Sequence, residues 1–148
     1  MSRALQGELD GALQAVIADM QTAVDELDQA LEAERGALSD GDSEALNAAG
    51  AHKQALMLKL EQLDTERLQL SRHSPAEAAR LEHAWQRVVQ CLRSAQQHNQ
   101  RNGQEVAQRL RQVRQALSIL TGHTGEAGVY GRAGELSVKM RSRVLAEA

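Results

Sequence analysis

The sequence predicts an all-α protein: an antiparallel bundle or coiled coil of three long helices, the third the longest, followed by a mobile glycine-rich C-terminal tail. Three observations support this prediction. The 148 residues include no Phe, one Trp, one Tyr and one Pro, and the abundant Ala, Leu, Gln, Glu and Arg are strong helix formers. Apolar residues recur at alternating steps of three and four. Two turn-forming stretches divide the periodic part of the chain into three legs.

The first predicted helix carries one continuous apolar stripe. Steps of three and four keep its members on one helical face. They are Leu9, Leu13, Val16, Ile17, Met20, Val24, Leu27, Leu31 and Leu38. The stretch Ser-Asp-Gly-Asp at 39–42 ends this helix, and Asp42 is a candidate N-cap for the next one.

The second predicted helix has its own stripe and ends near His73. The stripe consists of Leu46, Ala49, Leu56, Leu60, Leu63 and Leu70. The third leg begins at Ser74-Pro75-Ala76-Glu77. This order puts a capping serine before a proline at the first helical position and a glutamate at the third, which predicts a capping box.

The third leg is about 47 residues long, roughly 70 Å at 1.5 Å per residue, and therefore exceeds the other two. Its stripe comprises Leu81, Trp85, Val88, Leu92 and Ala95, weakens over 96–103, and resumes at Val106, Leu110, Val113, Leu117 and Leu120. Trp85 falls on the stripe and is interpreted as a core residue. Gly122 is a natural C-cap.

The excess length of the third leg predicts an overhang that begins near Gly103. Five aliphatic residues would then lack intrachain cover, and exposed apolar patches of this kind mark interaction sites. They are Val106, Leu110, Val113, Leu117 and Leu120. The tail, a second copy or a helix of another protein would cover them. In an alternative geometry the leg breaks at Asn102-Gly103 and forms a compact four-helix bundle.

The chain is predicted to have two parts, a helical domain over 1–121 and a flexible tail over 122–148. The tail carries five glycines between Gly122 and Gly134 and offers little to bury. A short helix over 135–146 would present Leu136 and Met140 on one face, and a helix of this length is marginal without a partner. We therefore predict that both residues contribute to partner binding. Tyr130 stands alone among glycines. The sequence is equally compatible with a binding role for it at an interface and with a surface tyrosine that has no role.

The composition predicts that the chain is not an enzyme, since ligand pockets are usually lined by aromatic side chains and this chain has almost none. No two of the five histidines lie three or four residues apart, and none pairs with Cys91 at metal-ligand spacing, so neither a metal nor a cofactor is expected. The one enzyme-like alternative is a phosphotransfer bundle with His98 as phosphoryl acceptor. However, the lysine-glycine that usually follows such a histidine is missing. Asn99 and Asn102 are compatible with solvated helix positions.

The charge and the chain start point to the cytoplasm. A net charge of −3 implies neither a nucleic-acid surface nor a membrane surface. No segment approaches the ~20 apolar residues that span a bilayer, and the N-terminus lacks a signal peptide. A single cysteine, Cys91, excludes an internal disulfide and fits a reducing compartment.

Four sequence stretches, taken in their order along the chain, carry a resemblance to a known family. They are L-E-A-E-R-G-A-L-S-D-G-D at 31–42, E-A-L-N-A-A-G-A-H-K-Q-A-L-M-L-K-L-E-Q-L-D-T-E-R at 44–67, N-Q-R-N-G at 99–103 and V-Y-G-R-A-G at 129–134. Together, from about Leu13 to Gly134, the chain resembles the FlgN family, cytosolic chaperones of flagellar type III export.

The resemblance implies a function. FlgN-like chaperones hold the hook-associated proteins FlgK and FlgL by their terminal amphipathic helices and deliver them to the cytoplasmic domain of the export-gate protein FlhA. By position, Asn99, Asn102 and Gly103 match the family's asparagine motif, and Tyr130 and Gly131 match its tyrosine-glycine, the implied gate contact. Assigning the overhang to the client rests on helix lengths alone. The competing class is a self-associating structural coiled coil, and a homodimer is open in either case.

Overall fold

The computed structural model describes residues 2–122 of the chain. Within them the protein is all-α, with no strand. Its helices are α1 (Arg3–Asp40), α2 (Ser43–His73), α3 (Pro75–Arg80) and α4 (Glu82–Thr121). The predicted all-α class is confirmed. The expectations for Tyr130, Gly131, Leu136 and Met140 lie outside the described residues.

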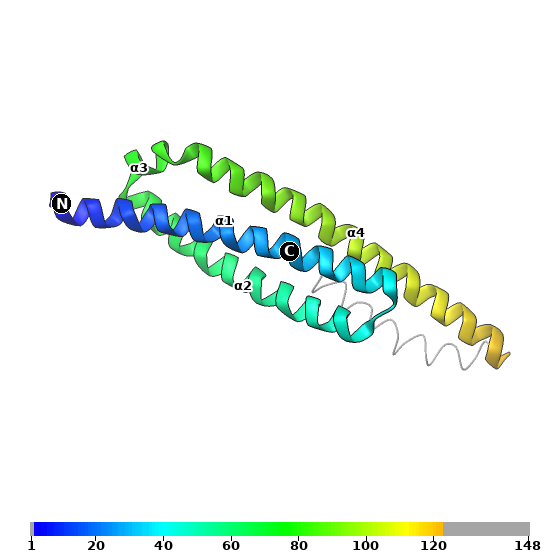
Figure 1. Ribbon diagram of the computed structural model, residues 1–148. Helices are drawn as coiled ribbons and strands as arrows, with labels where there is room; N and C mark the ends of the chain where they lie inside the picture. The colour runs from blue at the N-terminus through cyan, green and yellow to red at the C-terminus, as the bar shows by residue number, and fades with distance from the viewer. Residues whose placement is uncertain (1, 123–148) are drawn as a thin grey trace.

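The three long helices lie side by side in an elongated arrangement (Figure 1). α2 returns along α1, and α4 also packs along α1. α1 supplies most of the buried apolar residues, because its stripe faces both neighbours. The main core consists of Leu13, Val16, Ile17, Met20, Ala23, Val24, Leu27, Ala30, Leu31, Leu56, Leu60, Val88 and Ala95.

The turn between α1 and α2 follows the predicted chemistry. Gly41 adopts φ 69°, a left-handed conformation that favours glycine. Asp42 then caps α2, since its side chain accepts a hydrogen bond from the backbone N–H of Ala45 at 3.1 Å. The prediction that Asp42 is an N-cap is confirmed.

The start of the third leg differs from the prediction. Ser74 precedes Pro75 at the first helical position, but its side chain does not cap α3, so the predicted capping box is wrong. Instead Ser74 Oγ accepts from Gln6 Nε2 of α1 at 3.1 Å, and Glu77 accepts from Gln14 Nε2 at 2.8 Å. These polar side chains bind α1 rather than their own helix end. The leg is also divided, because α3 ends at Arg80 and Leu81 separates it from α4.

α4 runs without interruption through Gly103 and is the longest helix, with 40 residues. The alternative in which the chain breaks at Asn102-Gly103 is therefore wrong. The C-terminal end of α4 projects past the turn between α1 and α2 (Figure 1). Gly122 ends the helix at φ 63°, and its N–H donates to the carbonyl of Ser118, which confirms the predicted C-cap.

Trp85 packs against the main core while remaining partly exposed. The guanidinium carbon of Arg67 lies 3.7 Å from the centre of its ring, a cation–π contact between α2 and α4. The interpretation of Trp85 as a core residue is confirmed, with the ring at the edge of the core.

Candidate functional site

Four polar side chains lie inside the helix assembly, and we call them the buried polar layer: Glu34, Lys53, Asn99 and Asn102. Each is at most 3% exposed. They occupy places where the three-and-four spacing calls for an apolar residue. Glu34 falls between Leu31 and Leu38, Lys53 between Ala49 and Leu56, and the two asparagines between Ala95 and Val106.

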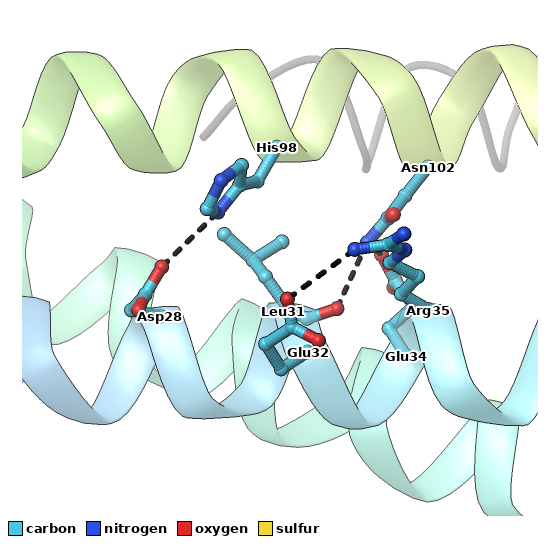
Figure 2. Close-up of polar contacts among 7 residues, drawn as sticks. All are labelled: Asp28, Leu31, Glu32, Glu34, Arg35, His98 and Asn102. Carbon is cyan, nitrogen blue, oxygen red and sulfur yellow. Dashed lines mark hydrogen bonds and ion pairs between the residues drawn. The ribbon is translucent and has the colours of Figure 1, made fainter.

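The buried polar layer joins all three long helices. Lys53 Nζ of α2 lies 3.0 Å from Glu34 Oε2 of α1 and donates to Asn99 Oδ1 of α4 at 3.0 Å. Asn102 Nδ2 donates to Glu34 Oε1 at 2.9 Å and to the carbonyl oxygen of Leu31 at 3.0 Å (Figure 2). Among the described residues, no buried side-chain nitrogen or oxygen lacks a partner. The layer is therefore a satisfied polar network.

Burial affects the ion pair in this layer in two ways: it shifts the pKa of Lys53, and it makes the loss of either partner costly. Burial lowers the pKa of Lys53 below its ordinary value, while the charge of Glu34 and the hydrogen bond to it act in the opposite direction. Removing one partner of a buried ion pair leaves the other charge uncompensated, which costs several kcal/mol. Because each helix contributes at least one member, the network aligns the three helices along their axes.

The asparagine motif of the sequence thus lies in the interior. Asn99 and Asn102 are 1% and 3% exposed, so reading them as solvated helix residues is wrong. Gly103 follows them as a partly buried residue of α4. Sequence reasoning missed Glu34 and Lys53. The signal that could have found them is the polar residue at a stripe position on each of the two helices.

A small pocket opens beside the layer, between α1 and α4. It has a volume of about 130 Å³ and is lined by Leu31, Glu32, Arg35, His98, Arg101 and Asn102. His98 Nδ1 lies 3.1 Å from Asp28 Oδ1 at its rim, with both side chains partly exposed (Figure 2). This contact joins α4 to α1 at the protein surface.

A second apolar cluster lies on the other side of the buried polar layer, toward the turn between α1 and α2. In it Leu38 and Val106 are buried, and Leu46 and Leu110 pack against them. Val106 is only 5% exposed, so the expectation that it lacks intrachain cover is wrong. α1 extends to Asp40, and Leu38 near its end packs against Val106.

Beyond this cluster the stripe of α4 becomes exposed, and we call this part the distal stripe: Leu110, Val113, Leu117 and Leu120. Leu110 is partly buried against Leu38 and Val106, so the expectation that it lacks intrachain cover is also wrong. Val113, Leu117 and Leu120 are 55%, 47% and 81% exposed. Water-exposed aliphatic side chains in one helical row form the kind of patch that partners cover.

An apolar groove leads into the distal stripe. It has a volume of about 170 Å³ and lies where α4 passes the turn between α1 and α2. Its lining residues are Ala37, Leu38, Gly41, Asp42, Ser43, Leu46, Val106, Arg109, Leu110 and Val113. The groove and the distal stripe share Leu110 and Val113, so they form one continuous surface.

Two further kinds of site are absent from residues 2–122. No group of three or more His, Cys, Asp or Glu side chains there is arranged to hold a metal ion. No helix in that part of the chain is long and apolar enough to cross a membrane.

Comparison with known proteins supports one family. The family model described as FlgN protein matches residues 9–137, a range that contains the buried polar layer and the distal stripe. Neither a comparison with curated proteins nor one with solved structures gave a match. Because the family model covers most of the 148 residues, the chain belongs to the FlgN family, a family of flagellar export chaperones.

Proposed function

We propose that this protein is a cytoplasmic flagellar export chaperone that binds the terminal amphipathic helices of hook-associated proteins of the FlgK and FlgL type. In this proposal it keeps those helices from assembling early and delivers them to the cytoplasmic domain of the export-gate protein FlhA. Membership of the FlgN family supports the chaperone role. The distal stripe supports the mode of binding.

The observation that carries the proposal is the row of exposed aliphatic side chains at the end of α4. Val113, Leu117 and Leu120 follow one another at steps of four and three, with about half or more of each side chain in water. An amphipathic helix binds such a surface with its own apolar anchors at equivalent spacing. The groove at the turn between α1 and α2 offers an additional apolar recess for one anchor.

The proposal assigns different tasks to the two parts of the chain. The helical part, 1–121, holds the client through the distal stripe. The tail, 122–148, contacts the export gate through Tyr130 and Gly131, while Leu136 and Met140 add apolar contacts to the client. The family match extends to residue 137 and therefore includes the tyrosine-glycine pair.

Calorimetric titration of the full chain with terminal segments of FlgK-type and FlgL-type proteins tests this function. The expected result is saturable one-to-one binding that is lost when the apolar face of the segment is replaced by Gln. A segment that binds equally well without its apolar face, or that does not bind at all, would contradict the proposal.

A self-associating structural coiled coil is the second candidate, because the same exposed stripe can pair with a second copy. Sedimentation equilibrium of the full chain separates the two functions. A chaperone is a monomer or a weak dimer whose association a client segment suppresses. A structural coiled coil is a tight oligomer that no client segment dissociates.

A further inference from the structure

We propose that the distal stripe selects an acidic amphipathic helix, with Arg109 and Arg114 as the residues that set this preference. The inference rests on the proposed function, since it names the chemistry of the helix that the same surface would bind. A partner helix of this kind would place its apolar face on the stripe and carboxylates along both edges.

The charged side chains on the part of α4 that carries the distal stripe all have one sign, and Asp42 is the one acidic residue that lines the adjoining groove. Residues 106–121 contain three arginines and no Asp or Glu. On a helix, residues four apart lie one above the other. Arg109 therefore lies beside Val113, and Arg114 lies beside Leu110. Both arginines are partly exposed and border the stripe on opposite sides, so a helix lying on the stripe meets a cation along each edge.

Arg109 is also part of the groove itself. It pairs with Glu105 of the same helix at 3.4 Å, with the two side chains 43% and 38% exposed. An exposed pair of this kind contributes little, so its arginine is available to a partner carboxylate at small cost. A docked helix would also exclude water from the edge of the groove and strengthen that new pair.

The same charges argue against the two other occupants. A second copy that paired stripe to stripe would bring its own Arg109 and Arg114 against the first set. The chain's own C-terminal segment over 135–146 carries Lys139, Arg141 and Arg143 against one acidic residue, Glu135, and is therefore also net positive. Like charges that face each other disfavour association. A helix of opposite charge from another protein is the occupant that the surface fits best.

Two designed peptides of equal length test this preference with the full chain. Both carry the same leucine stripe, and the flanking positions are all Glu in one and all Lys in the other. Fluorescence anisotropy should give about tenfold tighter binding of the Glu-flanked peptide at low salt. The difference should shrink in 1 M salt, where the Debye length is about 3 Å.

The reversal variant R109E/R114E should lose the preference or invert it. A matched control is R87E/R93E, which changes the net charge equally at two exposed positions of α4 far from the stripe, and it should keep the preference. If the wild-type chain binds both peptides equally, the charge inference is overturned while client binding stands. If client segments also fail to bind, the proposed function fails as well.

Two results would assign the stripe to another occupant and overturn the inference. Tighter binding of both peptides by the full-length variant L136Q/M140Q would mean that the C-terminal segment occupies the stripe. A dimer that V113Q/L117Q dissociates in sedimentation would assign the stripe to a second copy. The expected results are a peptide affinity that does not rise in the first variant and a wild-type chain that is monomeric at the assay concentration.

Discussion

Lys53 of α2 and Glu34 of α1 form an ion pair in the interior, with Nζ 3.0 Å from Oε2 and the two side chains 0% and 2% exposed. Asn99 and Asn102 attach α4 to the same pair. The pair lies between the main core and the small apolar cluster of Leu38 and Val106. The part of α4 that leads to the distal stripe is therefore held by a polar network followed by a short apolar contact.

Replacing Lys53 with Met should destabilise the fold by about 3 kcal/mol or more, because Glu34 is left buried without a counter-charge. Urea unfolding followed by the fluorescence of Trp85, the chain's one tryptophan, measures the change. The exposed Lys59→Met is the matched control and should stay close to wild type. Glu34→Leu combined with Lys53→Met should cost less than the sum of the single changes. Additive costs would mean that the two residues are not coupled.

The contribution of Lys53 to the free energy of unfolding should change with pH in the alkaline range. Burial lowers the pKa of Lys53 below 10.5 in the folded chain, so the unfolded chain binds more protons between that lowered pKa and 10.5. Linkage then makes the free energy of unfolding rise with pH across this window. The contribution is fully present above 10.5 and is lost as the pH falls through the folded pKa. Unfolding of wild type and Lys53→Met at several alkaline pH values measures it. A difference that falls with rising pH would mean that Glu34 outweighs burial.

A chain that ends at Gly122 should remain folded and helical. The apolar stripes of α1, α2 and α4 bury one another within residues 3–122, and both ends of α4 lie in that range. Circular dichroism at 222 nm during heating should give one cooperative transition near that of the full chain. Loss of cooperativity would mean that the residues after Gly122 belong to the core.

Tyr130→Ala should impair contact with the export gate while leaving client capture nearly unchanged. Removing an interface aromatic costs about 2 kcal/mol, roughly thirtyfold in affinity. Paired titrations of the variant measure both sides, one with a FlgK-type terminal segment and one with the FlhA cytoplasmic domain. Equal weakening of the two would assign Tyr130 to the client site and end the proposed division of tasks.

Most of the helical framework could be predicted from the sequence. The spacing of apolar residues identified all three long helices, and the chemistry of Gly41, Asp42 and Gly122 identified where they begin and end. Such local signals suffice because helix faces and caps depend on residues only a few positions apart. The prediction of a capping box was wrong because it considered local residues alone. Ser74 and Glu77 have the right spacing, but partners from distant parts of α1 compete for their side chains.

The site could be predicted only in part. The stripe positions identified Val113, Leu117 and Leu120 as exposed, and the error at Val106 arose because Leu38, near the end of α1, packs against it. The buried polar layer was harder to foresee, because spacing shows that Lys53 faces the core but not which groups meet it there. Glu34, Asn99 and Lys53 are far apart in sequence, and only the packing of three helices brings Lys53 Nζ to 3.0 Å from an oxygen of each of the other two.

Client binding by the exposed part of the distal stripe is tested most directly by the triple variant V113Q/L117Q/L120Q. These three side chains are exposed in the free chain, so their replacement should leave the melting temperature nearly unchanged. L5Q/L58Q/L68Q is the matched control, since it replaces three exposed aliphatic side chains elsewhere on the chain.

Titration with a FlgK-type terminal segment should give about a hundredfold weaker affinity for V113Q/L117Q/L120Q, at roughly 1 kcal/mol for each lost anchor. The L5Q/L58Q/L68Q control should bind like wild type. Wild-type affinity in the stripe variant, or an equal loss in the control, would contradict client binding at the end of α4.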